Sequence, residues 1–151
     1  MISLDTNALV RMLIEDDQDQ YQAVQKVISL VEKNSRQILL LSEVLMETIW
    51  VLESIYQCTR EDISEFLERL TITPTFTITD PEVIRRAVHQ YKQGGDFADL
   101  IIVSKSKENR AKKFFSFDKK LQKKFPDYVV GKISSADLKK NNGTMNNKKV
   151  M

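Results

Sequence analysis

The chain has 151 residues, of which 42% are hydrophobic and 29% charged, the composition of an ordinary soluble globular domain. Its longest apolar runs are far too short to cross a bilayer, which argues against a membrane protein. The single cysteine, Cys58, cannot form an internal disulfide, so we expect a protein of the reducing cytoplasm. The first residues also lack the pattern of a secretory signal, so none is expected.

The net charge of +2 conceals an asymmetry along the chain. Residues 1–75 carry 6 lysines and arginines against 13 acids, a net charge of −7, whereas residues 76–151 carry 17 against 8, a net charge of +9. This division suits an acidic metal site beside a basic surface that attracts phosphate backbones. The alternative, that the lysines only solvate helix faces, stays open at this point.

Apolar periodicity and capping residues predict alternating strands and helices. We expect strands at 2–4, 38–41, 75–78, 114–117 and 128–130, and helices at 9–15, 19–33, 43–56, 60–70, 81–93, 97–109 and 118–124. Ser42 and Asp80 are the predicted N-caps of two of these helices. Strands separated by helices indicate an α/β fold, a parallel sheet with helices on both faces. We place one domain at 1–138 and a disordered polar tail at 139–151.

Two acids directly follow predicted strands. Asp5 ends the first strand and Asp118 ends the strand that begins at Phe114. The carboxyl ends of parallel strands form the edge where open α/β folds bind ligands, which favours a site. Either residue could instead be only the N-cap of the helix that follows, and for Asp118 this explanation is nearly as good.

A third acid lies on a predicted helix. Glu47 has Val44, Trp50 and Val51 as its neighbours one turn away, so we expect it on an apolar face, where a carboxylate needs a partner. Glu43, one turn earlier, is the rival candidate. It also has an ordinary role at the helix start, where a negative charge is favourable.

Asp96 and Asp99 are spaced to share one face at the start of a helix. After Gly94-Gly95, Asp96 is a natural cap, so we interpret Asp99 as the primary ligand and Asp96 as a secondary one. Several carboxylates that converge repel one another unless a cation lies between them. Their hard oxygens suit Mg²⁺ or Mn²⁺.

Together these motifs resemble the PIN-domain nucleases, and most closely the VapC-type toxins of toxin–antitoxin pairs. The resemblance covers roughly residues 1–130, and the matching segments are Leu4–Asn7, Leu45–Glu47 with Trp50–Leu52, Asp96–Ile101 and Ser116–Asp118.

The resemblance implies a three-layer α/β/α fold in which a cluster of acids binds Mg²⁺ or Mn²⁺ and hydrolyses RNA phosphodiester bonds. By position, the cluster consists of Asp5, Glu47, Asp99 and Asp118, with Asp96 at its edge. Asn7 and Ser116 match polar residues that support such acids by hydrogen bonds. The resemblance also implies a homodimer and a small antitoxin that covers the acidic pocket. We expect antitoxin contacts on exposed apolar positions of the first two helices and of the helix 43–56.

Two other classes of function are weighed against this one. Haloacid-dehalogenase-like phosphatases need a second acid two residues after the first, where this chain has Asn7, and receiver domains need an acidic pair at the first strand. A PIN fold that binds RNA or protein without cutting is the stronger rival, although the filled acid positions argue against it. His89, the lone histidine, is expected to be at the surface or half-buried rather than catalytic.

Overall fold

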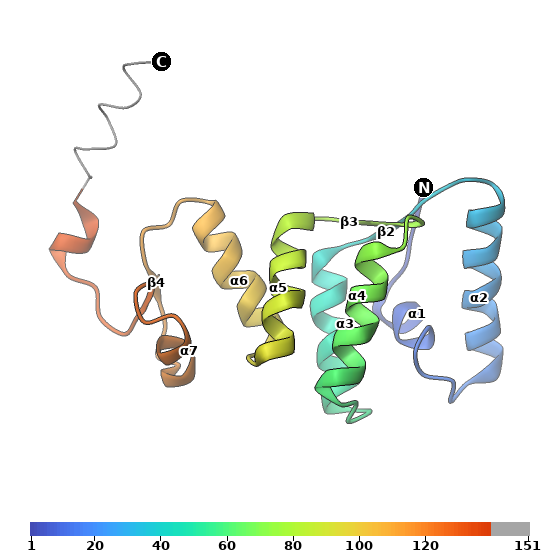
Figure 1. Cartoon of the computed structure of the whole chain (residues 1–151), viewed down its shortest axis with the longest axis horizontal. Helices are drawn as coiled ribbons and strands as arrows, with labels where there is room; N and C mark the ends of the chain where they lie inside the picture. The colour runs from blue at the N-terminus through green and yellow to red at the C-terminus, as the bar shows by residue number, and fades with distance from the viewer. Residues whose placement is uncertain (140–151) are drawn as a thin grey trace, which may run out of the picture. The chain divides into compact units, whose positions relative to one another are not determined.

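The structure is a computed structural model that describes residues 1–139, so residues 140–151 of the predicted tail lie outside the described residues. The described residues divide into two compact units, residues 1–104 and residues 105–139 (Figure 1). Helix α6 (Phe97–Glu108) runs from the first unit into the second.

The sheet of the first unit has three short parallel strands. They are β1 (Ile2–Ser3), β2 (Ile38–Leu40) and β3 (Phe76–Ile78). The strand order is β1-β2-β3, and Ile38 of the central strand lies opposite both Ile2 and Phe76. Parallel neighbours need a crossover connection, which helices supply here. The predicted α/β class is therefore confirmed.

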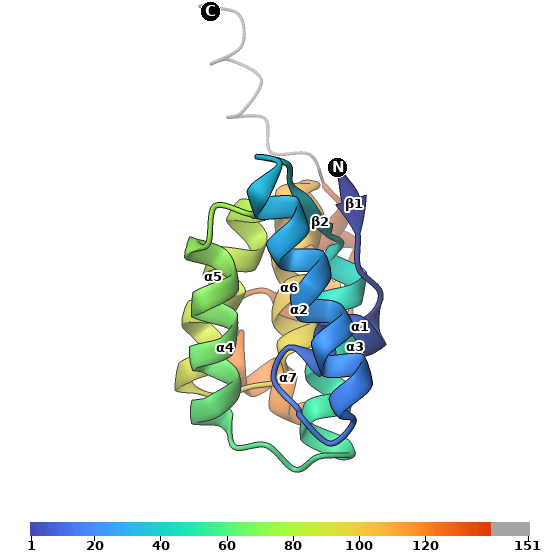
Figure 2. The same cartoon turned by 90° about the vertical axis from the view of Figure 1, so that its right-hand side faces the viewer.

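Helices flank this sheet. They are α1 (Thr6–Arg11), α2 (Gln18–Lys33), α3 (Ser42–Ser54), α4 (Arg60–Ile72), α5 (Pro81–Gln93) and the first turns of α6. Helix α1 packs against α2 and α3, and α4 packs against α5 and α3. Figure 2 shows α4 and α5 on one side of the unit and α1 and α2 on the other. Full burial of each large apolar side chain between these layers contributes about 1.5–3 kcal/mol. Among the most deeply buried are Leu9, Ile38, Leu40, Leu45, Ile49, Leu52, Ile63, Leu67, Ile84, Phe97, Leu100 and Ile101.

Of two predicted helix caps, Ser42 is wrong, whereas Asp80 does occupy the N-cap position of α5 but makes no side-chain capping bond. Ser42 is the first residue of α3 rather than its cap, and its hydroxyl donates to Oδ2 of Asp80 at 3.1 Å. The backbone N–H of Ser42 donates to Oγ1 of Thr79 at 2.8 Å. Asp80 precedes α5 with a left-handed backbone (φ 50°), and its side chain makes no capping bond. These residues instead join the segments that follow β2 and β3.

The second unit contains a separate parallel pair of strands, β4 (Phe114–Phe115) and β5 (Val129–Val130). Helix α7 (Lys119–Lys124) lies between them in sequence, and a short 3₁₀ helix (Ser135–Leu138) follows. The fold class agrees with the prediction, but the described strands form two sheets instead of one. Within the second unit, the N–H groups of Phe114 and Ser116 donate to the carbonyls of Tyr128 and Val130 in the β5 segment.

Among residues 1–139, no helix combines the length and the apolar character needed to cross a membrane.

Candidate functional site

Asp5 stands between β1 and α1, at the carboxyl end of the strand. Its Oδ1 accepts a hydrogen bond from the backbone N–H of Ala8 at 2.9 Å, so it is the N-cap of α1. This capping explains why the helix begins at Thr6 rather than at the predicted Leu9. The carboxylate is exposed, and its second oxygen is a further potential donor to a cation. Asn7, predicted to support the acids, is exposed in the first turn of α1.

Glu47 is exposed on α3, and the prediction of an apolar, buried surrounding is wrong. Trp50, one turn later on the same face, is 60% exposed. The buried face of α3 carries Leu45, Ile49 and Leu52 instead. Glu43 is exposed as well, so burial does not distinguish the two glutamates. Both remain candidates for the acid on this helix.

Asp96 and Asp99 lie together at the start of α6. Oδ1 of Asp96 accepts from the backbone N–H of Asp99 at 3.0 Å, and its carbonyl accepts from Leu100 at 3.0 Å. Asp96 is exposed and Asp99 is half-buried, next to the buried Leu100 and Ile101. The predicted capping role of Asp96 is confirmed, because its carboxylate is held by the backbone of Asp99 at the helix start.

Sequence reasoning missed a polar contact that holds the turn before Asp96. Nη1 of Arg60, at the start of α4, donates to the carbonyls of Tyr91 and Gly95, both at 2.8 Å. The guanidinium also lies over the Tyr91 ring, 4.3 Å from its centroid. Gly94 and Gly95 both have positive φ, 133° and 99°, which favours glycine at these positions. Arg60 therefore ties the end of α5 to the turn that leads into α6.

Glu53 joins the same contact from α3. The hydroxyl of the buried Tyr91 is hydrogen-bonded to the Glu53 carboxylate. Burial raises the pKa of Glu53, and the negative charge of Asp96 raises it further. Burial, followed by the charge of Glu53, raises the pKa of Tyr91 to about 12. The first unit thus places an additional carboxylate beside Asp96, with a phenol that stays protonated at neutral pH.

Asp118 lies in the second unit, where it caps α7. Its Oδ1 accepts from the backbone N–H groups of Lys120 at 2.9 Å and Leu121 at 3.2 Å. The hydroxyl of Ser116 accepts from the N–H of Asp118 at 3.1 Å. Ser116 therefore fixes the backbone of Asp118, and the predicted cap is confirmed.

The structure brings only some of the predicted acids together. Asp96 is joined to Asp99 by a hydrogen bond, whereas Asp5 precedes α1 and Glu47 lies on α3 of the same unit. Within residues 1–139, no three acidic, histidine or cysteine side chains lie close enough to hold a metal ion. The donor chemistry still fits Mg²⁺, which keeps several waters and binds through one or two carboxylates plus substrate phosphates. A pair of carboxylates such as Asp96 and Asp99 meets this requirement, which does not call for a closed set of protein ligands.

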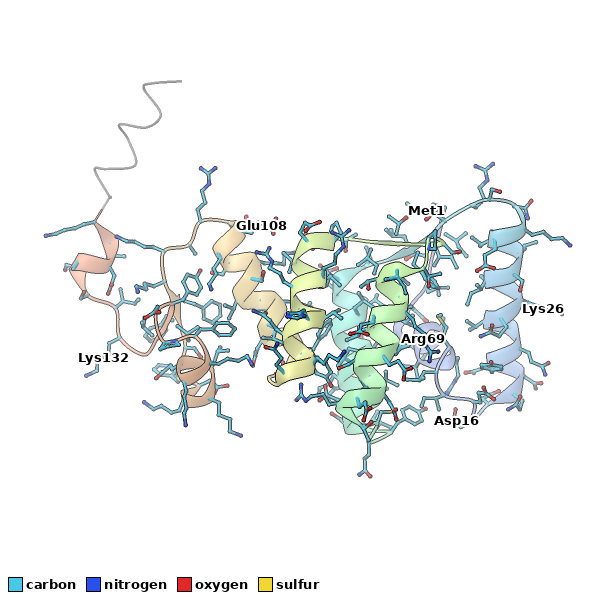
Figure 3. All side chains as sticks on the ribbon, in the orientation of Figure 1. Met1, Asp16, Lys26, Arg69, Glu108 and Lys132 are labelled. Atoms are coloured by element: carbon cyan, nitrogen blue, oxygen red, sulfur yellow. The ribbon has the colours of Figure 1, made fainter. Side chains whose placement is uncertain are left out.

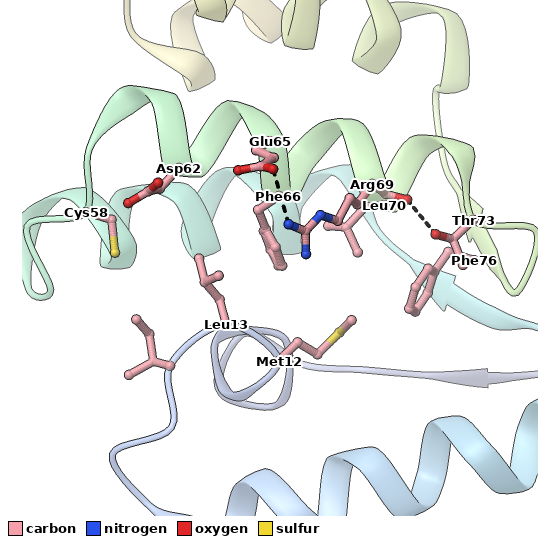
Figure 4. A pocket seen from close by; sticks show the side chains of 11 residues that line it. Met12, Leu13, Cys58, Asp62, Glu65, Phe66, Arg69, Leu70, Thr73 and Phe76 are labelled. Carbon is pink, nitrogen blue, oxygen red and sulfur yellow. Dashed lines mark hydrogen bonds and ion pairs between the residues drawn. The ribbon is translucent and has the colours of Figure 1, made fainter.

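A separate apolar groove runs between the end of α1 and α4 (Figure 4). It has a volume of about 530 Å³ and an apolar floor that includes Leu13, Phe66 and Phe76. The charged pair Glu65 and Arg69, 3.3 Å apart, lies along it. Cys58 also lines the groove, and burial raises the pKa of its thiol. None of the predicted site acids lines this groove.

The chain belongs to the PIN domain family, whose model matches residues 2–125, a range that includes every acid described above. It is similar to the VapC ribonuclease of Aquifex aeolicus (strain VF5), with 26% identity over 121 residues. That match covers 80% of this chain and 89% of the relative. No solved structure matches the chain.

Proposed function

We propose that this protein is a divalent-metal-dependent ribonuclease that hydrolyses RNA phosphodiester bonds, and that it is the toxin of a type II toxin–antitoxin pair. The observation that carries the proposal is the PIN domain match over residues 2–125, within which the acids follow strands or begin a helix. The similarity to a VapC ribonuclease over 80% of the chain supports the same activity.

The proposed metal ligands are Asp5 and Asp99, with Asp96 at the edge of the site. Asp118 completes the set, and its place rests on the sequence match alone. A bound Mg²⁺ or Mn²⁺ would stabilise charge on the scissile phosphate and activate water. Glu47, exposed on α3, has the chemistry to orient that water and accept its proton.

The polar neighbours have supporting roles in this proposal. Arg60 holds the turn before Asp96 through two carbonyl contacts, which keeps the Asp96–Asp99 pair in one orientation. Ser116 does the same for the backbone of Asp118. Asn7, exposed in α1, is available to hydrogen-bond a ligand or a neighbouring acid.

The test is cleavage of total cellular RNA by the purified protein with Mg²⁺, Mn²⁺ or EDTA, beside Asp99→Asn. Asp19→Asn is the matched control, because Asp19 is an exposed aspartate in the first turn of α2 and the substitution removes the same charge. The proposal requires metal-dependent cleavage that Asp99→Asn abolishes and Asp19→Asn retains. Cleavage that persists in EDTA, or that Asp99→Asn leaves unchanged, would refute it.

A non-catalytic PIN-fold module that binds RNA or protein is the second candidate. It is favoured by one observation, that no three potential ligands are grouped within residues 1–139. Retained RNA binding without cleavage by the wild-type protein, in any of the three metal conditions, would establish this alternative.

The proposed partners are RNA, a small antitoxin and a second copy of the chain, and the proposed compartment is the cytoplasm. Antitoxin contacts are expected at the exposed apolar side chains of the flanking helices, Leu30 on α2, Trp50 on α3 and Ile55 after it. Light scattering of the purified chain tests the dimer. The antitoxin surface is tested by co-purification of a small protein that inhibits cleavage. Leu30→Asp should weaken the binding of that protein.

A further inference from the structure

Two phenylalanine side chains stand exposed beside Asp118 in the second unit. Phe117 directly precedes Asp118 and is 80% exposed, and Phe115 is 51% exposed. Their rings pack edge to face, with centroids 5.1 Å apart and planes at 76°. In this arrangement each ring keeps at least one face that the other does not cover. An 80% exposed phenylalanine contributes little to a core, so folding of the unit does not account for it.

Local backbone geometry explains why both rings share one side. Successive side chains of an extended segment alternate, so Phe115 and Phe117 project to the same side while Phe114 turns the other way. Phe114 is half-buried, in agreement with this alternation. The hydrogen bonds of Ser116 to the β5 segment and to the N–H of Asp118 hold the backbone between the two rings.

The surroundings of the rings are strongly basic. Residues 105–139 carry 11 lysines and arginines against four acids, a net charge of +7. Lys119 and Lys120 follow Asp118 and are exposed. Since consecutive Cα atoms are about 3.8 Å apart, their Cα atoms lie within about 8 and 11 Å of that of Phe117. Lys132, also exposed, projects from the same unit (Figure 3).

Open aromatic faces beside flexible cations are the combination that single-stranded nucleic acid requires. Unpaired bases stack on aromatic side chains, and lysines neutralise the phosphates between them. A duplex offers its phosphates but keeps its bases stacked on one another, so it can use the lysines and not the rings. A protein partner would bury the rings as well, but the net charge of +7 favours a polyanion.

We propose that Phe117, with Phe115 beside it, is a stacking platform for unpaired bases of an RNA strand whose phosphates contact Lys119 and Lys120. This inference rests on the proposed ribonuclease function in one respect: the neighbouring Asp118 places the platform next to a proposed metal ligand. The platform therefore selects single-stranded RNA as the substrate class and positions the nucleotide beside the scissile bond.

The experiment measures binding separately from cleavage. A short fluorescent RNA of mixed sequence, about 12 nucleotides long, is titrated in EDTA with Asp99→Asn protein, alone and annealed to its complement. The variants are Phe117→Ala, Phe117→Trp and Phe115→Ala. Ile72→Ala is the matched control, because Ile72 is 77% exposed at the end of α4 in the first unit. Circular dichroism confirms that each variant is folded.

We expect Phe117→Ala to weaken single-strand affinity about 5- to 100-fold, the effect of losing one stacked base. Phe115→Ala should weaken it less, and Phe117→Trp and Ile72→Ala should retain it. Duplex affinity should be nearly unchanged in all variants. Equal affinity of Phe117→Ala and Ile72→Ala for the single strand would overturn the platform, as would equal losses for strand and duplex.

A direct readout of stacking uses Phe117→Trp in a Trp50→Phe background, which leaves one tryptophan in the chain. Single-stranded RNA should quench its fluorescence more strongly than the duplex, and equal quenching would overturn the proposal. Cleavage by the wild-type protein with Mg²⁺ is measured in parallel. Stacking without cleavage would refute the ribonuclease and leave the platform intact, whereas cleavage that Phe117→Ala does not affect would refute the platform alone.

Discussion

Arg60 is the residue whose removal most directly tests how the acidic pair is held. Arg60→Met keeps most of the apolar stem and removes the guanidinium. It deletes the hydrogen bond to the Tyr91 carbonyl, which is partly buried and worth about 1.5 kcal/mol, and the exposed one to Gly95, worth about 0.5–1 kcal/mol. Loss of the contact over the Tyr91 ring adds about 0.5–1 kcal/mol. We expect the free energy of unfolding to fall by about 2.5–3.5 kcal/mol, the sum of these three losses.

Urea denaturation followed by tryptophan fluorescence measures this loss, because the single tryptophan, Trp50, belongs to the first unit. Arg69→Met on the same helix is the control: Arg69 is 72% exposed and pairs with Glu65 only at the surface, so we expect a change within about 0.5 kcal/mol. RNA cleavage by Arg60→Met should fall as well, because the turn before Asp96 loosens. If Arg60→Met unfolds at the same urea concentration as Arg69→Met, the turn is not held as we infer.

Three further outcomes are expected. Because the pKa of Glu53 is raised above its ordinary value of 4.5 in the folded state, folding favours its neutral form, and stability falls as the pH rises from about 4.5 through the raised pKa. Glu53→Gln should flatten that part of the stability profile in thermal unfolding, and an unchanged slope would contradict the assignment. Asp5→Ser keeps a capping oxygen and removes the charge, so the melting temperature should hold while cleavage is lost; parallel loss of both would make Asp5 only a cap. Replacing Lys119 and Lys120 with glutamine should reduce the salt dependence of single-strand RNA binding, the slope of log K against log salt, by about 1.4, and an identical slope would exclude phosphate contacts there.

The helices and strands were largely predictable because their apolar spacing is regular. Helix α5 begins at Pro81 and ends before Gly94-Gly95, as predicted from its boundary residues. Helix α3 is a case in which apolar spacing does not identify the buried face. It has apolar residues on two faces, and Trp50 on the exposed face gives the same periodic signal as Leu45 and Ile49 on the buried one. The sequence alone does not indicate which of the two apolar faces of α3 is buried. Glu47 was therefore expected to be buried because it lies on the face that carries Trp50, which is exposed.

Contacts between distant segments were beyond the sequence for a different reason. The hydrogen bonds of Arg60 join residues 31 and 35 positions apart, and no local pattern marks them. The pairing of Glu53 with Tyr91 is of the same kind, since it joins two separate helices, α3 and α5. The positions of Asp5, Asp96 and Asp118 at strand ends and helix starts were predictable because these signals are local, whereas their role in a metal site stays a prediction. The side chains that surround the acids of the first unit could not be predicted, because they are brought there by the packing of distant helices.

The same local geometry explains why the sequence alone left cap and ligand undecided. An aspartate that caps a helix after a strand must have an extended backbone and a carboxylate turned toward the first N–H groups of the helix. A ligand at the carboxyl edge of a parallel sheet occupies the same place. Asp5, Asp96 and Asp118 each use Oδ1 for a backbone N–H. Capping uses one oxygen of the carboxylate and leaves the second one open, so in the proposed site the cap would hold a surface acid in place for a cation.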